Sequence, residues 1–209
     1  MVLYNPLLYK NHLERDDVMN LLAHLYLSNG INDMMFGNYI ADSVKGRQYL
    51  EYPEEIQKGI LLHRAIDTFT DKHPLHKQSR DRFRSNYGLF SGVVIDIVYD
   101  HYLAKNWALY SSELLSDFAK KAYDYISLNE TMLPSKLKLV TPHMIRSNWI
   151  LMYQNISGIE RVLAGMSRNT SLPNEVRFAS KVINREYKQI EHEFMHFFSD
   201  LRDFTKTRS

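Results

Sequence analysis

The chain has 209 residues, of which 44% are hydrophobic and 12% aromatic, so it can bury the core of one compact domain and is not a disordered chain. Its 26 basic and 24 acidic side chains give a formal charge of +2, which argues against a basic nucleic-acid-binding arm and against an acidic tail. The absence of cysteine excludes disulfides, thiolate catalysis, zinc fingers and iron–sulfur clusters.

The N-terminal region predicts neither a leader nor an anchor. Residues 1–18 are polar and irregular, without a basic start followed by an apolar run, and no later stretch approaches the roughly 18 consecutive apolar residues of a membrane span. We therefore expect a cytoplasmic protein with no membrane partner. Patterned sequence opens at Met19, so we interpret 1–18 as an N-terminal extension and 19–204 as one helical domain.

Helical spacing of apolar residues recurs along the rest of the chain. Pro53 followed by two glutamates is typical of a helix start, and Pro74 ends that helix and begins another. The expected helical segments are 20–27, 39–44, 54–73, 74–83, 93–103, 114–128, 144–153, 159–166 and 175–204. With no alternating strand pattern and few glycines or prolines, the sequence predicts an all-α single domain of about eight helices.

Polar side chains interrupt the apolar faces of these helices. His63 and Asp67 continue the stripe that Ile56 and Ile60 begin, one helical turn apart. Side chains four residues apart lie about 6 Å from each other, so both can reach one metal ion. In the segment VVIDIVYDHYL, Asp100 lies among valines and isoleucines, and His101 follows it.

Two further segments offer the same chemistry, through His24 in LLAHLYL and Asp42 in NYIADSVKG. A buried histidine alone is more often a hydrogen-bonded core residue, but buried carboxylates without a cation cost several kcal/mol each. We therefore expect a metal site built from all four segments. Carboxylates and imidazoles without sulfur favour Mn²⁺, Mg²⁺ or Fe²⁺ over structural zinc.

A divalent ion in such a site would activate water and polarise a phosphoryl oxygen. Arg64, directly after His63, is then a candidate catalytic residue, because a planar guanidinium suits a phosphate. An ordinary helix-packing arginine is an equally good interpretation.

Two other clusters of polar residues can be interpreted with or without a function. His192, Glu193 and His196 spell the H-E-x-x-H signature of zinc proteases, but none of the 13 residues that follow is a His or Glu that could be the third ligand. We interpret this motif as a chance match. Arg80 and Arg84 share a helix face within a basic stretch, which fits either a docking patch for an acidic partner or a solvated face.

Several segments together resemble one known family. They are MNLLAHLYLS at 19–28, GNYIADSVKG at 37–46, GILLHRAIDTFTDKHP at 59–74 and DIVYDHYLAKNW at 96–107. They are similar to the bacterial acyl-carrier-protein phosphodiesterases, and the likeness covers nearly all of 19–200. The resemblance implies an HD-domain-like helical fold and Mn²⁺-supported hydrolysis of the phosphodiester between 4′-phosphopantetheine and a serine of holo acyl carrier protein.

The resemblance also implies roles for individual residues. The implied metal ligands are Asp42, His63, Asp67 and Asp100, and His24 and His101 would complete the sphere or act as acid and base. Arg80 and Arg84 become candidates for docking the acidic carrier protein. The chain lacks the adjacent His-Asp pair that names HD proteins. An HD-type nucleotide phosphohydrolase and a non-enzymatic helical binding protein remain the alternatives, and the oligomeric state is open.

Overall fold

The computed structural model describes residues 21–208, and within them the chain is all-α, as predicted. The helices are α1 (Leu21–Leu27), α2 (Asp33–Ile40), α3 (Glu54–Lys72), α4 (Pro74–Asp81), α5 (Arg84–Tyr87), α6 (Ser91–Lys105), α7 (Leu115–Leu128), α8 (Ser135–Arg146), α9 (Trp149–Met152), α10 (Ile156–Asn169) and α11 (Val176–Lys206). Short 3₁₀ turns join some of them, including η2 (Ala41–Ser43). The expected extension 1–18 lies outside the described residues.

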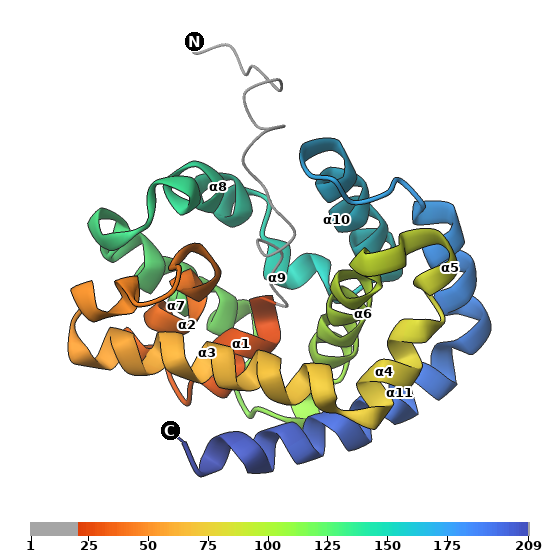
Figure 1. Ribbon diagram of the computed structural model, residues 1–209, viewed down its shortest axis with the longest axis horizontal. Helices are drawn as coiled ribbons and strands as arrows, with labels where there is room; N and C mark the ends of the chain where they lie inside the picture. The colour runs from red at the N-terminus through yellow and green to blue at the C-terminus, as the bar shows by residue number, and fades with distance from the viewer. Residues whose placement is uncertain (1–20, 209) are drawn as a thin grey trace.

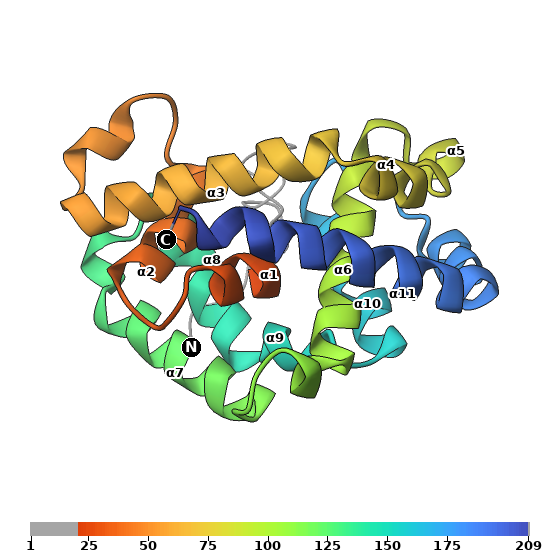
Figure 2. The same cartoon turned by 90° about the horizontal axis from the view of Figure 1, so that it is seen from below.

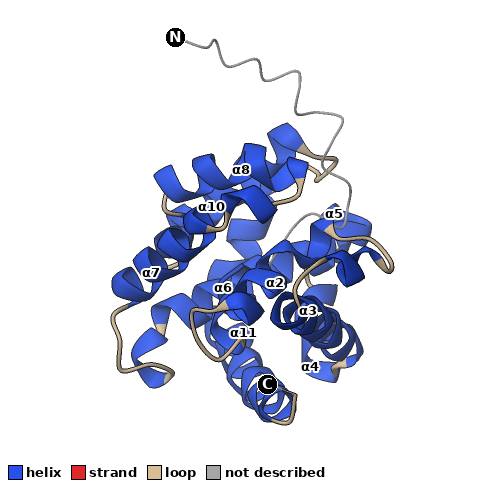
Figure 3. Ribbon diagram, turned by 90° about the vertical axis from the view of Figure 1, so that its left-hand side faces the viewer, coloured by secondary structure: helices blue, strands red, loops and turns tan. Residues whose placement is uncertain are grey.

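The described helices outnumber the eight that were predicted. The excess comes partly from α5 and α9, each of four residues, which are too short to show any repeated apolar spacing. Figure 3 shows helices and loops over the described part of the chain, without a strand. None of the helices in residues 21–208 has the length and apolar character that crossing a bilayer requires.

The longest helix, α11, has 31 residues and forms one side of the molecule (Figures 1 and 2). It packs against α4, α6 and α3, so segments far apart in sequence are held together by one long element, which is kinked at Glu186. Its inward face carries Phe194, Phe197 and Phe198, all buried. This face follows from apolar residues recurring at steps of three and four.

The boundaries of α3 follow from local chemistry. Pro53 occupies the N-cap position, and Glu54 and Glu55 lie in the first turn, where negative charge is favourable. The helix ends at Lys72 because His73 is extended ahead of Pro74, which starts α4 as its first residue. The helix predicted from the two prolines is therefore confirmed.

Two glycines bring α2 and α3 into backbone contact. A Cβ at Gly37 would lie 2.1 Å from the carbonyl oxygen of Ile56, and one at Gly59 would lie 2.0 Å from that of Met34. No side chain fits either position. The two helices can approach this closely only because both positions are glycine, and the approach sets residues of α2 against the His63 region of α3.

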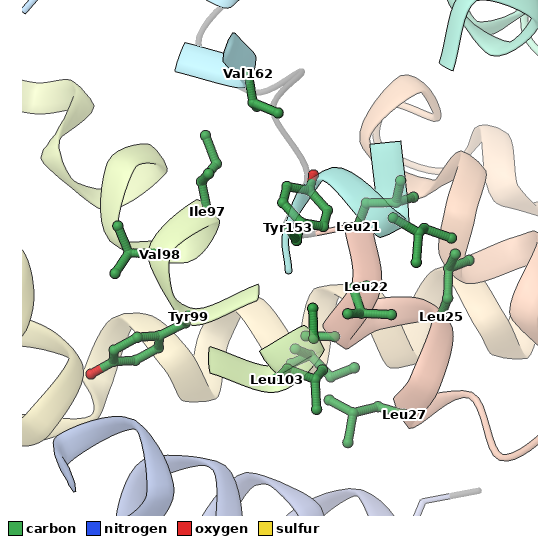
Figure 4. Close-up of a cluster of buried hydrophobic side chains, with 14 of the residues drawn as sticks. Leu21, Leu22, Leu25, Leu27, Ile97, Val98, Tyr99, Leu103, Tyr153 and Val162 are labelled. Carbon is green, nitrogen blue, oxygen red and sulfur yellow. The ribbon is translucent and has the colours of Figure 1, made fainter. Parts of the chain in front are cut away.

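Helix α1 is a short apolar element inside the core. Its leucines at 21, 22, 25 and 27 are buried, and Figure 4 shows them beside Leu103 of α6 and Tyr153. Seven residues are too few for a helix to be stable alone in water, so α1 depends on this packing. His24 lies in the middle of it and is fully buried.

Candidate metal centre

Four polar side chains meet where α1, α3 and η2 come together. His24 comes from α1, His63 and Asp67 from α3, and Asp42 from η2. Nε2 of His63 lies 2.9 Å from Asp42 Oδ1 and 3.1 Å from Asp67 Oδ2, and Nε2 of His24 lies 3.3 Å from Asp67 Oδ1. The ligand atoms of His24, His63 and Asp67 all lie within 4.8 Å of one another. These three can therefore share one cation, with Asp42 beside them.

The two imidazoles are stacked, with ring centroids 4.0 Å apart and planes 25° apart. Both are held by Asn38 of α2, whose Oδ1 lies 2.7 Å from His24 Nδ1 and 3.0 Å from His63 Nδ1. Asn38 Nδ2 in turn donates to the carbonyl oxygen of His24 and to Ser28 Oγ, so Oδ1 is the acceptor. The carbonyl oxygen of Asn38 is a further acceptor, 2.9 Å from His63 Nδ1.

This arrangement fixes the tautomers. An amide or carbonyl oxygen only accepts, so each Nδ1 carries the hydrogen. When a ring is neutral, its Nε2 is left with a lone pair directed toward the carboxylate oxygens. Second-shell acceptors of this kind orient histidines that bind metals. In the neutral state, His24 and His63 can therefore bind a cation through Nε2, and when protonated His63 donates from the same atom to Asp42.

The charges fit the same interpretation. Nε2 of His24 is buried without a hydrogen-bond partner among the described residues. Burial alone would lower the pKa of His63, but hydrogen bonds and charge from Asp42 and Asp67 outweigh it and raise the pKa to about 10. Burial likewise opposes ionisation of Asp67, yet the imidazoles hold its pKa well below the usual range. The carboxylates thus favour positive charge at the Nε2 atoms, which either protons on the imidazoles or a divalent cation in their place supplies.

Exposure differs between the imidazoles and the carboxylates. The side chains of His24 and His63 are 1% and 3% exposed, whereas those of Asp42 and Asp67 are 23% and 47% exposed. The cluster therefore has a closed imidazole side and an open carboxylate side.

The structure does not bring Asp100 to this cluster. Its two carboxylate oxygens accept the backbone N–H groups of Leu22 and Ala23, each at 2.9 Å. These are among the first N–H groups of α1, which have no partner within the helix. Asp100 thus holds the start of α1, the helix that carries His24. These two hydrogen bonds account for the burial of the Asp100 carboxylate without a metal ion.

His101 is likewise placed elsewhere. Its Nδ1 lies 2.7 Å from the carbonyl oxygen of Tyr153, and its Nε2 lies 2.7 Å from the hydroxyl of Tyr187. Both ring nitrogens are occupied, and burial lowers its pKa, which favours the neutral ring. The structure therefore gives His101 a packing role between α6 and α11, in place of the expected acid–base role.

Arg64 contacts a loop and not the cluster. Its guanidinium donates to the carbonyl oxygens of Val44 and Gly46 and lies over the ring of Tyr49. This loop follows directly after Asp42 in η2. The geometry makes Arg64 a positioning residue for that loop and leaves the expected phosphate contact without support.

The basic stretch is split between two environments. The Arg80 and Arg84 side chains are 25% and 66% exposed, and each lies 3.7 Å from Asp81. Arg82 between them turns inward to Glu186 and Glu193. Of these three arginines, only Arg80 and Arg84 are available to a partner.

Glu193 of the H-E-x-x-H segment is a structural residue. Its carboxylate is 1% exposed and accepts hydrogen bonds from Arg82, Gln78 and Gln189, with a further short bond from Ser79. His192 and His196 lie on the exposed side of α11. Because the acid and the two histidines face opposite ways, the zinc-protease arrangement is absent from these residues.

Asn38 is the site residue that sequence reasoning missed. It lies in GNYIAD, between the candidate Asp42 and the glycine that contacts α3. The available signal in the sequence was an amide side chain within an apolar segment, and the structure shows that this side chain is fully buried. Its two histidine partners are 14 and 25 residues away and cannot be identified from spacing.

By its fold and its cluster of polar side chains, the chain is a helical protein with a candidate centre for a divalent cation. A model of the family described as acyl carrier protein phosphodiesterase matches residues 19–201. Relatives named acyl carrier protein phosphodiesterase include one from Yersinia pestis, 32% identical over 86% of this chain and 94% of the relative. One from Klebsiella pneumoniae is 31% identical over 88% of this chain and 95% of the relative.

The chain belongs to the acyl carrier protein phosphodiesterase family. The resemblance seen in the sequence is thereby confirmed, and the family name denotes a hydrolase of a phosphodiester. No solved structure matches the chain significantly. The HD-domain-like character of the fold stays a prediction.

Proposed function

We propose that this chain hydrolyses the phosphodiester that joins 4′-phosphopantetheine to a serine of holo acyl carrier protein. Water attacks phosphorus, the bond from phosphorus to the serine oxygen breaks, and that oxygen leaves with a proton. The products are apo acyl carrier protein and 4′-phosphopantetheine. A cytoplasmic location is part of the proposal, because enzyme and carrier protein must share a compartment.

The observation that carries the proposal is the convergence of the Nε2 atoms of His24 and His63 with the carboxylates of Asp42 and Asp67. We infer that His24, His63 and Asp67 hold a divalent cation, with Mn²⁺ as the first candidate and Mg²⁺ or Fe²⁺ as alternatives. When bound, the cation would supply Lewis acidity, which polarises a phosphoryl oxygen and acidifies the attacking water.

The remaining steps, which are positioning of the ligands and removal of a proton from water, fall to residues of the chain. Asn38 keeps both imidazoles in one tautomer, and Arg64 holds the loop after Asp42. Asp42 is the candidate general base, because it is partly exposed and contacts only one of the two imidazoles. Asp100 and His101 support the site through α1 and α6 and do not act on the substrate.

The direct test is the intact mass of holo acyl carrier protein after incubation with the purified protein and Mn²⁺. We expect loss of the prosthetic group, prevention by a chelator, and recovery on adding back Mn²⁺. If the group stays on while a known carrier-protein hydrolase removes it, the proposal is wrong.

Matched variants separate the site from general effects on α3. Asp67→Asn and His63→Gln should abolish turnover with little change in helicity. Asp71→Asn removes an exposed carboxylate one turn further along the same helix and should retain full activity. Equal activity in Asp67→Asn and Asp71→Asn would contradict the placement of the centre.

Docking of the carrier protein forms a separate part of the proposal. Arg80 and Arg84 offer exposed positive charge to an acidic surface. Charge reversal to glutamate at both positions should raise KM, with little change in kcat and a weaker dependence on salt. The same reversal at Arg161, an exposed arginine of α10, is the control and should leave KM unchanged.

A further inference from the structure

The outer face of α11 presents two histidines that the hydrolytic site does not use. His192 and His196 are exposed and lie on adjacent turns. Their Nε2 atoms are 3.1 Å apart and their ring centroids 4.5 Å apart. The two rings thus turn toward each other, and no ion pair with an acid is found for either among the described residues.

The separation of the two nitrogens suits a shared metal ion. Bonds from a transition metal to imidazole nitrogen are about 2.0–2.1 Å long, so two such nitrogens at a tetrahedral or right angle lie roughly 3 Å apart. The pair already has this spacing.

The backbone that carries the pair is also fixed. Between and beside the two histidines, Phe194, Phe197 and Phe198 anchor the opposite face of α11 in the core. Little ordering of the main chain is therefore needed when an ion binds, which removes part of the usual entropic cost.

We propose that His192 and His196 form a second, solvent-facing site for a borderline transition metal such as Cu²⁺, Ni²⁺ or Zn²⁺. Water completes the coordination. Two imidazoles without a carboxylate favour these ions over Mn²⁺ and Mg²⁺, which prefer oxygen ligands. The site is therefore separate in chemistry from the carboxylate-rich centre at His63 and Asp67.

The site has no protease chemistry. In a zinc protease of this motif the glutamate acts as general base beside the metal. Here Glu193 is buried on the inner side of α11 and bound to Arg82. The histidines bind an ion without a base beside it.

Paramagnetic broadening by Cu²⁺ tests the site directly. In the amide NMR spectrum of the full chain, Cu²⁺ below one equivalent should broaden signals from about residues 188–200. Signals around His24 and His63 report separately on the inner centre. The broadening at 188–200 should be lost in His192→Gln and in His196→Gln.

The control is His143→Gln, which removes an exposed histidine of α8 that has no histidine one turn away. This variant should keep the broadening at 188–200, and His192→Gln should keep full Mn²⁺-supported hydrolysis. Absence of selective broadening at 188–200, or its persistence in His192→Gln, would overturn the proposal. Because activity is read independently, failure of this site leaves the proposed hydrolysis untouched.

Discussion

The role of Asn38 can be tested by replacing it with alanine. The substitution removes two acceptor contacts, to Nδ1 of His24 and of His63, and two donor contacts, to the carbonyl oxygen of His24 and to Ser28. Nδ1 of His63 keeps the backbone carbonyl of residue 38 at 2.9 Å, but Nδ1 of His24 loses its acceptor. The damage should therefore fall mainly on the orientation of His24.

The size of the effect follows from these contacts. A buried donor left without a partner costs about 1–3 kcal/mol, so we expect the free energy of unfolding to fall by roughly 3 kcal/mol once the other lost bonds are added. Loss of an outer-shell partner typically weakens metal binding 10–100-fold, or about 1.4–2.8 kcal/mol. Mn²⁺ affinity should fall by that factor.

Calorimetric titration of the metal-free protein with Mn²⁺ measures the affinity, and urea unfolding measures the stability. Asn32→Ala is the matched control, because Asn32 caps the same helix through the N–H of Met35 and does not touch the imidazoles. That variant should lose about 1 kcal/mol of stability and none of its affinity. A folded Asn38→Ala protein that binds Mn²⁺ as tightly as the wild type would refute the tautomer argument.

Three further substitutions probe other parts of the structure. Glu193→Gln breaks a buried ion pair with Arg82 and should destabilise the fold by about 3–5 kcal/mol in urea, with Mn²⁺ affinity unchanged. Burial opposes ionisation of Glu193, but Arg82 lowers its pKa below the ordinary 4.5, so its stabilisation is present above that pH and is lost on acidification. Stability should then fall less steeply between about pH 5 and pH 3 in the variant than in the wild type, and equal slopes would argue against the pair. Gly59→Ala should cost at least about 3 kcal/mol or prevent folding, whereas Gly92→Ala, whose Cβ would meet nothing nearer than 3.9 Å, should be tolerated. Asp100→Asn should cost about 1.5–3 kcal/mol and speed hydrogen exchange at the first amides of α1, and unchanged exchange would show that this carboxylate does not hold the helix.

Much of the fold was predictable because its signals are local. Prolines mark the ends of α3 and the start of α4, and apolar spacing defines the long helices. The spacing of His63 and Asp67 on one helix face was also sufficient to predict that their side chains lie together. These features depend on residues within a few turns of each other.

The remainder depends on contacts that spacing does not encode. An apolar setting correctly predicted that Asp100 is buried, but its partners are backbone groups 77 and 78 residues away. The same reasoning predicted burial of His101 without revealing its partners, the carbonyl of Tyr153 and the hydroxyl of Tyr187. Burial of a polar residue can thus be deduced from one sequence, whereas the identity of the group that compensates it cannot.

If the cluster is the catalytic centre that we propose, the half-exposed carboxylate of Asp67 bears on the size of its substrate. A scissile bond on the surface of a folded protein cannot thread into a deep tunnel, because the rest of that protein would collide with the rim. Under the proposed function the buried imidazoles and the partly exposed acids place the reacting phosphodiester on the accessible side of the cluster. Two rounded macromolecules can therefore meet there without either one unfolding.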